Sequence, residues 1–190
     1  MSSLAKEKHI PGEAGIWVFV FGDMCIFGLF FVTFAYYRSF DLDLFQQSQL
    51  QLNQNWGALN TVLLLTSSWF VVMGMSAVRK GLRSLARKCL SLAWLCGLGF
   101  GIVKVFEYGE KIEHGITLTT NDFFMYYYIF TGIHFLHLII GMAVLAYMIL
   151  RLRHNNPLAN DLALLESGAT YWHMVDLLWI ILFSLLYLIK

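Results

Sequence analysis

Charged residues are scarce in this sequence. Of its 190 residues, 13% are Asp, Glu, Lys or Arg, whereas an ordinary soluble domain carries about a quarter. Hydrophobic residues make up 58%, and the mean hydropathy is +0.64. The formal net charge of +1 provides no clustered excess of Lys and Arg for phosphates, which argues against nucleic acid as a partner. The composition therefore indicates a membrane protein.

Cysteine and proline are also rare. Cys25, Cys89 and Cys96 fall in or beside apolar stretches and form no C-x-x-C pair, so neither a disulfide framework nor a zinc site is predicted. Pro11 and Pro157 both lie in predicted loops. Carriers generally break their helices with Gly or Pro at the depth of the binding site, so this placement argues against a carrier.

Long apolar stretches are what the sequence has in abundance. Crossing the hydrocarbon core takes about 20 mostly apolar residues in a helix. Such stretches are too long for the strands of a membrane barrel. We predict an all-α membrane protein in which residues 1–190 form one bundle of five transmembrane helices, over residues 14–37, 58–78, 85–106, 123–150 and 168–189.

The basic residues are distributed unequally between the two sides of this bundle. Lys and Arg are enriched in cytoplasmic loops, so the richer side is predicted to be cytoplasmic. This places the N-terminus in the cytoplasm and the C-terminus in the periplasm, with a bacterial inner (cytoplasmic) membrane as the location. One side carries nine basic residues (Lys6, Lys8, Arg79, Lys80, Arg83, Arg87, Lys88, Arg151 and Arg153) and the other four (Arg38, Lys104, Lys111 and Lys190). Lys104 lies near a span end, where its long side chain is expected to reach the interface.

Away from the basic residues at the ends of the span 85–106, the predicted spans contain two acids and three histidines: Asp23, His134, His137, His173 and Asp176. All but His134 are placed at overlapping depths in the membrane. Each such residue in hydrocarbon requires a partner, water or neutralisation. His134 and His137 are three residues apart on one predicted helix, and His173 and Asp176 are three residues apart on the next. This i, i+3 spacing puts each pair on one helix face. Three interpretations stay open: a hydrogen-bonded cluster that holds the helices together, a proton-related or lipid-headgroup site, and a metal site. A hydrogen bond from Asp176 to His134 or His137 is a hypothesis under the first interpretation.

Asp23 is surrounded in sequence by Phe and Met residues. An acid in such a setting is expected to be neutral, since the charged form is poorly solvated there. Two roles stay open for it: a hydrogen bond across a helix interface, and proton handling at a partner subunit.

Other segments yield weaker expectations. Gly97 and Gly101 form a G-x-x-x-G pair that allows close helix packing. The Gln-rich linker after the first span is compatible with an interfacial helix and with a polar loop. Near the predicted span ends, contacts with lipid or a partner are expected for Glu107, Glu110, Glu166 and Trp172.

Several strings resemble subunit III of the haem-copper oxidases. ESGATYWHMVDLLWIILFSLLY at residues 166–187 is similar to the final helix of that family, and TGIHFLHLIIG at 131–141 is similar to the helix before it. NTVLLLTSS at 60–68 and FEYGE at 106–110 resemble two earlier helices, in the same order. Asp23 stands where the mitochondrial subunit has an intramembrane glutamate.

The chain has five predicted helices, whereas the long form of the family has two more at its N-terminus. The five-helix length and PGEAGIWVFVFGD, EYGEKIEHGITLTTNDFFMYY and YWHMVDLLW most resemble NorE proteins, which are associated with nitric oxide reductase.

The resemblance implies a non-catalytic subunit that packs against the catalytic subunit of a nitric oxide reductase or a terminal oxidase. It would stabilise that subunit and support its proton uptake, with phospholipid bound. In the family, the first helices of this five-helix set face the partner. Haem and copper or iron are expected on the partner, because this chain has too few intramembrane histidines for them. No catalytic centre, metal or cofactor is therefore predicted here. The alternatives are a stand-alone proton or small-solute carrier and a metal-binding membrane enzyme.

Overall fold

The described part of the protein is entirely helical. The structure is a computed structural model that describes residues 12–153 and 161–189. No strand occurs within these ranges. Five of the helices are long and apolar enough to cross a membrane. The elements are α1 (Ala14–Phe40), α2 (Leu42–Leu50), α3 (Gln54–Arg79), α4 (Arg83–Glu113), α5 (Asp122–Arg151), α6 (Asp161–Phe183) and the π-helix η1 (Ser184–Leu188).

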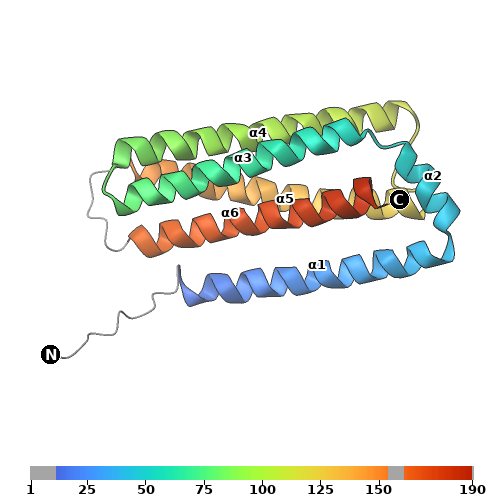
Figure 1. The fold of residues 1–190 in the computed structure, drawn as a ribbon, viewed down its shortest axis with the longest axis horizontal. Coiled ribbons are helices and arrows are strands. Elements are labelled where there is room, and N and C mark those ends of the chain that lie inside the picture. The colour runs from blue at the N-terminus through green and yellow to red at the C-terminus, as the bar shows by residue number, and fades with distance from the viewer. Residues whose placement is uncertain (1–11, 154–160, 190) are drawn as a thin grey trace.

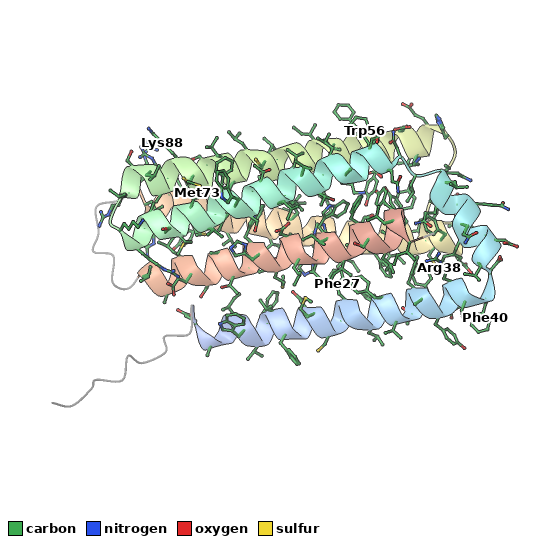
Figure 2. The ribbon with its side chains drawn as sticks, viewed as in Figure 1. Phe27, Arg38, Phe40, Trp56, Met73 and Lys88 are labelled. Atoms are coloured by element: carbon green, nitrogen blue, oxygen red, sulfur yellow. The ribbon has the colours of Figure 1, made fainter. Side chains whose placement is uncertain are left out.

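Four of the long helices form a closed bundle, and the first lies beside it. α3 packs against α4, α4 against α5, α5 against α6, and α6 against α3. α1 contacts α6 and α5 and runs along one side of this bundle, as Figure 1 shows. Phe27 of α1 points toward the bundle, whereas the side chains of Phe40 and Lys88 point away from it (Figure 2). The two ends of the described chain lie at opposite ends of the molecule.

The helix ends explain where the predicted boundaries differ from the structure. Side chains of Asn53 and Asn121 accept hydrogen bonds from backbone N–H groups in the first turns of α3 and α5. α4 continues to Glu113, beyond the predicted end at residue 106, and α6 begins at Asp161 rather than at 168. Both extensions contain charged residues, so the apolar stretches are shorter than the helices that contain them. Lys104 and Glu107 therefore lie within one continuous helix.

The Gln-rich linker contains a helix, the first of the two possibilities that its sequence left open. α2 crosses the end of the bundle and contacts α5 and α1. Its Phe45 and Ser48 are buried: the Phe45 ring packs edge-on against Phe123, and Ser48 accepts a hydrogen bond of 2.8 Å from the Asn121 amide. α2 is thus tied to the start of α5.

Trp172 occupies the middle of the bundle. Its side chain is 1% exposed and its Nε1 donates to Ser67 Oγ at 3.1 Å. A Cβ atom on Gly97 would come within 2.8 Å of this indole, and one on Gly141 would do the same. The two glycines therefore make room for a tryptophan ring. Gly101 is different, because a Cβ there would meet only Phe135, at 3.7 Å. Gly97 and Gly101 do not act together as one close-packing motif.

Candidate functional site

A buried ion pair with two tyrosines lies inside the bundle. Lys104 Nζ and Glu107 Oε2 are 2.9 Å apart, and the two side chains are 2% and 0% exposed. Lys104 also donates to the hydroxyl oxygens of Tyr127, at 3.2 Å, and Tyr187, at 3.1 Å. Both hydroxyls in turn donate to Glu107 Oε1. We call these four residues the Lys104 cluster; it joins α4, α5 and η1.

Helix geometry and aromatic rings produce this arrangement. Lys104 and Glu107 are three residues apart on α4, so they lie on one face of that helix. The Nζ atom lies 4.9 Å from the ring centroid of Tyr127 and 5.1 Å from that of Trp179. Such rings attract a cation, and an ion pair this deeply buried requires partners for every hydrogen-bonding position. The expectation that Lys104 reaches the interface is wrong, because its ammonium points into the bundle instead.

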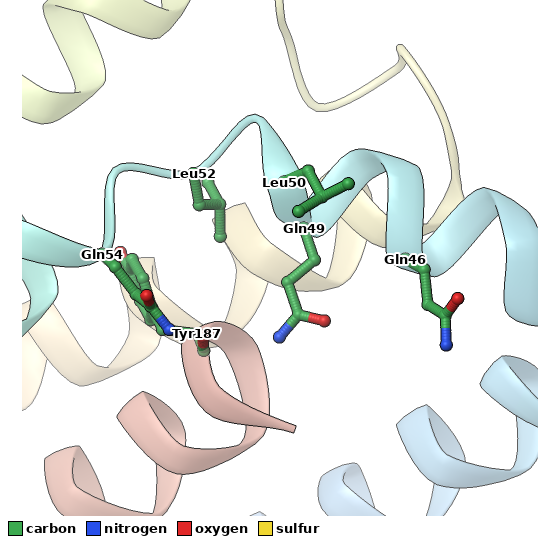
Figure 3. Close-up of a pocket in the computed structure, with 6 residues that line it drawn as sticks. All are labelled: Gln46, Gln49, Leu50, Leu52, Gln54 and Tyr187. Carbon is green, nitrogen blue, oxygen red and sulfur yellow. Dashed lines mark hydrogen bonds between the residues drawn. The ribbon is translucent and has the colours of Figure 1, made fainter. Parts of the chain in front are cut away.

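A small cavity lies next to the Lys104 cluster, between α2 and the end of η1 (Figure 3). Its volume is about 250 Å³, and Gln46, Gln49, Leu50, Leu52, Gln54 and Tyr187 line it. The Gln54 amide donates to the Tyr187 carbonyl oxygen at 2.8 Å. Tyr187 belongs both to this cavity and to the Lys104 cluster.

Asp23 and His137 form a second polar contact, between α1 and α5. Asp23 Oδ2 and His137 Nε2 are 3.2 Å apart, and both side chains are nearly buried. His137 Nδ1 donates to the Ile133 carbonyl oxygen at 2.9 Å. With Nδ1 as a donor, the pair must share one further proton, either on the imidazole or on the acid. This contact is one of several that the overlapping depths of these residues allowed, and it links α1 to α5.

The other three predicted cluster residues lie elsewhere. His134 is fully buried, and its Nε2 donates to the Val175 carbonyl oxygen at 3.0 Å. His173 Nδ1 lies 2.6 Å from Ser68 Oγ on α3, and Asp176 Oδ1 has no hydrogen-bond partner in the described part of the chain. No hydrogen bond joins Asp176 to His134 or His137 among the described residues, because His134 bonds Val175 and His137 bonds Ile133 and Asp23. The five residues therefore do not form one cluster.

The four residues expected to contact lipid or a partner differ in their exposure. Glu110 is exposed, as that expectation requires. Glu107 and Trp172 are buried inside the chain, so neither reaches its surface. Glu166 is 4% exposed; it pairs with Arg79 at 3.0 Å and accepts a hydrogen bond from the Gly12 backbone N–H at 3.1 Å. Its contacts hold the start of α1 and the end of α3 against α6.

The sequence did not indicate which side chains pair with the predicted site residues. Lys104, Tyr127, Tyr187, Arg79 and Ser68 were not among the predicted site residues. The i, i+3 spacing of Lys104 and Glu107 was the one local signal that could have found the cluster. The rest come from other helices, so spacing within one helix could not indicate them. Among the described residues, no three His, Cys, Asp or Glu side chains come together as metal ligands would.

Comparison with known proteins gives one consistent result. The family model for cytochrome c oxidase subunit III matches residues 7–190. Cytochrome c oxidase subunit 3 of Synechocystis sp. is 28% identical over 202 residues, which cover 100% of this chain and 85% of the relative. The Corynebacterium diphtheriae protein of the same name is 31% identical over 141 residues, 73% of this chain and 68% of the relative.

A longer relative carries two subunit names. The heme-copper oxidase subunit I+III of Aeropyrum pernix is 28% identical over 184 residues, which cover 93% of this chain and 22% of that protein. The family model spans all five membrane helices, including the residues of the Lys104 cluster and the Asp23–His137 pair. The chain therefore belongs to the cytochrome c oxidase subunit III family.

Proposed function

We propose that this chain is a non-catalytic, multi-pass subunit of a haem-copper respiratory complex, which packs against catalytic subunit I and stabilises it. Membership of the subunit III family supports this role. The Aeropyrum pernix relative adds support, because its name joins subunits I and III and this chain resembles 22% of its length. Haem and copper or iron belong to the partner in this proposal.

The surface of α1 is the observation that carries the docking part of the proposal. Of the 27 residues in α1, only Phe27 and Phe34 are buried. Val18, Phe21 and Phe40 are at least 70% exposed, so a long apolar face of α1 is not covered by the described part of the chain. A catalytic subunit that spans the same membrane provides an apolar helix surface for this face.

A nitric oxide reductase is the partner that the sequence favours over a terminal oxidase. The resemblance to NorE proteins at residues 11–23, 107–127 and 171–179 supports this narrower proposal. The Asp23–His137 pair lies between α1 and α5, on the side of α1 that packs against the bundle. That position is compatible with support of proton uptake by the partner.

Membrane lipid is the second proposed partner, in the bacterial inner membrane. An apolar groove of about 430 Å³ lies between α1, α5 and α6, and another of about 510 Å³ lies between α4 and α5. Grooves of this composition suit acyl chains. The excess of basic residues near the N-terminal end of the bundle supports a cytoplasmic position for that end.

Purification from gently solubilised membranes tests the proposal. We expect a tagged chain to bring down a haem-bearing polypeptide, and the absorption spectrum and metal content of that polypeptide separate a nitric oxide reductase from a copper-containing oxidase. An extract in which the tag is fully recovered without any haem protein, at every detergent strength that keeps respiratory complexes intact, would contradict subunit membership.

A further inference from the structure

The cavity between α2 and η1 has polar walls without charge. Three glutamines, two leucines and Tyr187 line its volume of about 250 Å³, and none of these described residues carries a charge. A water molecule occupies about 30 Å³ in the liquid, so the cavity has room for a group of several heavy atoms. A charged group without an ion-pair partner is costly to bury, so these walls favour a neutral ligand.

Gln49 brings to this cavity a hydrogen-bond donor that lacks an acceptor. Its Nε2 atom is buried and has no hydrogen-bond partner in the described part of the chain. Figure 3 shows the Gln49 side chain extending away from α2, on the side of the cavity where η1 ends. A buried donor without an acceptor is unfavourable, so we expect this amide to bond to the group that occupies the cavity.

Gln54 offers the opposite kind of atom. Its Nε2 donates to the Tyr187 carbonyl oxygen at 2.8 Å, so its Oε1 is the atom that remains to accept a hydrogen bond from a ligand. A carbonyl oxygen only accepts hydrogen bonds and an ammonium group only donates them, whereas a hydroxyl group does both. A donor on Gln49 and an acceptor on Gln54 therefore favour a ligand with hydroxyl groups.

The surroundings of α2 place this cavity next to lipid. Leu50 lines the cavity and is 72% exposed. Phe40 and Leu42, where α1 meets α2, are exposed as well. Apolar side chains on the outer surface of a helix that crosses the end of a membrane bundle are typical of an interfacial helix. The headgroup of a lipid can therefore enter the cavity while its acyl chains stay outside.

We propose that this cavity binds a neutral polyhydroxy group, the sugar or glycerol that a membrane lipid carries as its headgroup. One hydroxyl oxygen accepts from Gln49 Nε2, and a hydroxyl group donates to Gln54 Oε1. The carbon atoms of the ligand pack against Leu50 and Leu52. The site rests on the proposed partnership with membrane lipid, but it lies apart from the two acyl-chain grooves, which can hold lipid whether or not the cavity does.

Lipid retention by the purified full chain tests this proposal. Native mass spectrometry measures which lipids stay bound after release from nanodiscs of phosphatidylcholine and galactosyl diacylglycerol. We expect the wild type to prefer the galactosyl lipid, because the phosphatidylcholine headgroup has no hydroxyl group. Gln49→Leu should reduce this preference roughly 2- to 10-fold, the effect of one hydrogen bond to a neutral group. Gln47→Leu, at an exposed position of α2 outside the cavity, should keep it. No preference in the wild type, or an unchanged preference in Gln49→Leu, would overturn the proposal.

A second pair of variants tests the cavity while Gln49 and Gln54 are kept. Gln46→Trp places a bulky side chain in the cavity and should also weaken the preference, whereas Gln47→Trp should not. Circular dichroism shows whether each variant is folded, and an unchanged preference in folded Gln46→Trp would contradict binding in this cavity. Free methyl galactoside separates the two sources of the ligand: if it displaces the galactosyl lipid, the sugar alone binds, and if it does not, the acyl chains contribute. Phosphatidylcholine retained by Gln49→Leu reports on the acyl-chain grooves separately.

Discussion

A lysine and a glutamate tolerate complete burial in this bundle because all three donors of the lysine and both oxygens of the glutamate have partners. The ammonium group has three donors, and Lys104 directs them to Glu107, Tyr127 and Tyr187. The Glu107 carboxylate accepts from Lys104 on one oxygen and from both phenols on the other. A network in which every member is satisfied rigidifies the helices that carry it, whereas removal of one member leaves an expensive unpaired group.

Lys104→Met is therefore predicted to be strongly destabilising. It leaves the Glu107 charge buried without its cation, which costs about 3–5 kcal/mol of unfolding free energy. The double variant Lys104→Met/Glu107→Gln should lose less than the sum of the two single losses, since neither charge remains. Thermal unfolding in detergent measures these differences. Lys88→Met, at an exposed position on the same helix, is the matched control and should be neutral.

The Asp23–His137 pair should contribute less to the unfolding free energy than the Lys104 cluster does. It is a single contact between α1 and α5, and hydrogen bonds between membrane helices are worth roughly 0.6 to 1.7 kcal/mol. Asp23→Asn and His137→Gln should each lower the unfolding free energy by about this amount, and the double variant should lose little more than either alone. Strict additivity in a double-mutant cycle would indicate that the two side chains do not interact.

At the scale of elements, α6 and η1 connect the polar sites. α6 bears Glu166 near its start, His173 and Asp176 further along and Trp179 beside Lys104. Its last turn widens into the π-helix η1, where the Tyr187 hydroxyl joins the Lys104 cluster and its carbonyl oxygen accepts from Gln54. π-Helical turns occur frequently at functional sites. The most deeply packed helix thus also carries most of the polar contacts.

Packing around Trp172 leads to a matched pair of substitutions on α4. Gly97→Ala places a methyl group within 2.8 Å of the rigid indole, and overpacking of this kind costs about 1–3 kcal/mol. Gly101→Ala meets nothing closer than 3.7 Å and should be neutral or slightly stabilising, because Ala favours a helix over Gly. Melting temperatures of the two variants compare these effects directly. Equal losses would mean that both glycines contact another helix closely.

The sequence predicted the long helices because their apolar stretches are set by bilayer thickness. It predicted the Asp23–His137 contact only as one of several possible meetings, since depth in the membrane limits which residues can meet but does not choose among them. The Lys104 cluster escaped prediction because charged residues near the end of an apolar stretch normally reach the interface. Whether such a side chain turns inward depends on Tyr127 and Tyr187, which other helices provide.

At the scale of the whole molecule, the chain has a tightly packed part and a loosely attached part. The closed bundle of α3, α4, α5 and α6 contains the Lys104 cluster and Trp172. By contrast, α1 is the least buried of the five spans, since only 11% of the residues in its apolar 18-residue stretch are buried. α1 is held mainly through Asp23, through Phe27 and Phe34, and through the contacts of the Gly12–Glu13 backbone with Glu166 and Ser167. A helix attached along one side leaves its other side to lipid or to a partner.

The proposed docking face predicts which positions lie next to the catalytic subunit. A photoreactive phenylalanine analogue at Phe21, which is 72% exposed on α1, should cross-link to a haem-bearing polypeptide in native membranes. The same analogue at Leu95, which is 55% exposed on α4, should cross-link only to lipid, because α4 lies on the far side of the bundle from α1 (Figure 1). The two positions lie at comparable depth, since Phe19 contacts Tyr171 and Gly97 adjoins Trp172. Mass spectrometry of the cross-linked products identifies the partner. Protein adducts at Leu95 with none at Phe21 would move the docking face from α1 to α4.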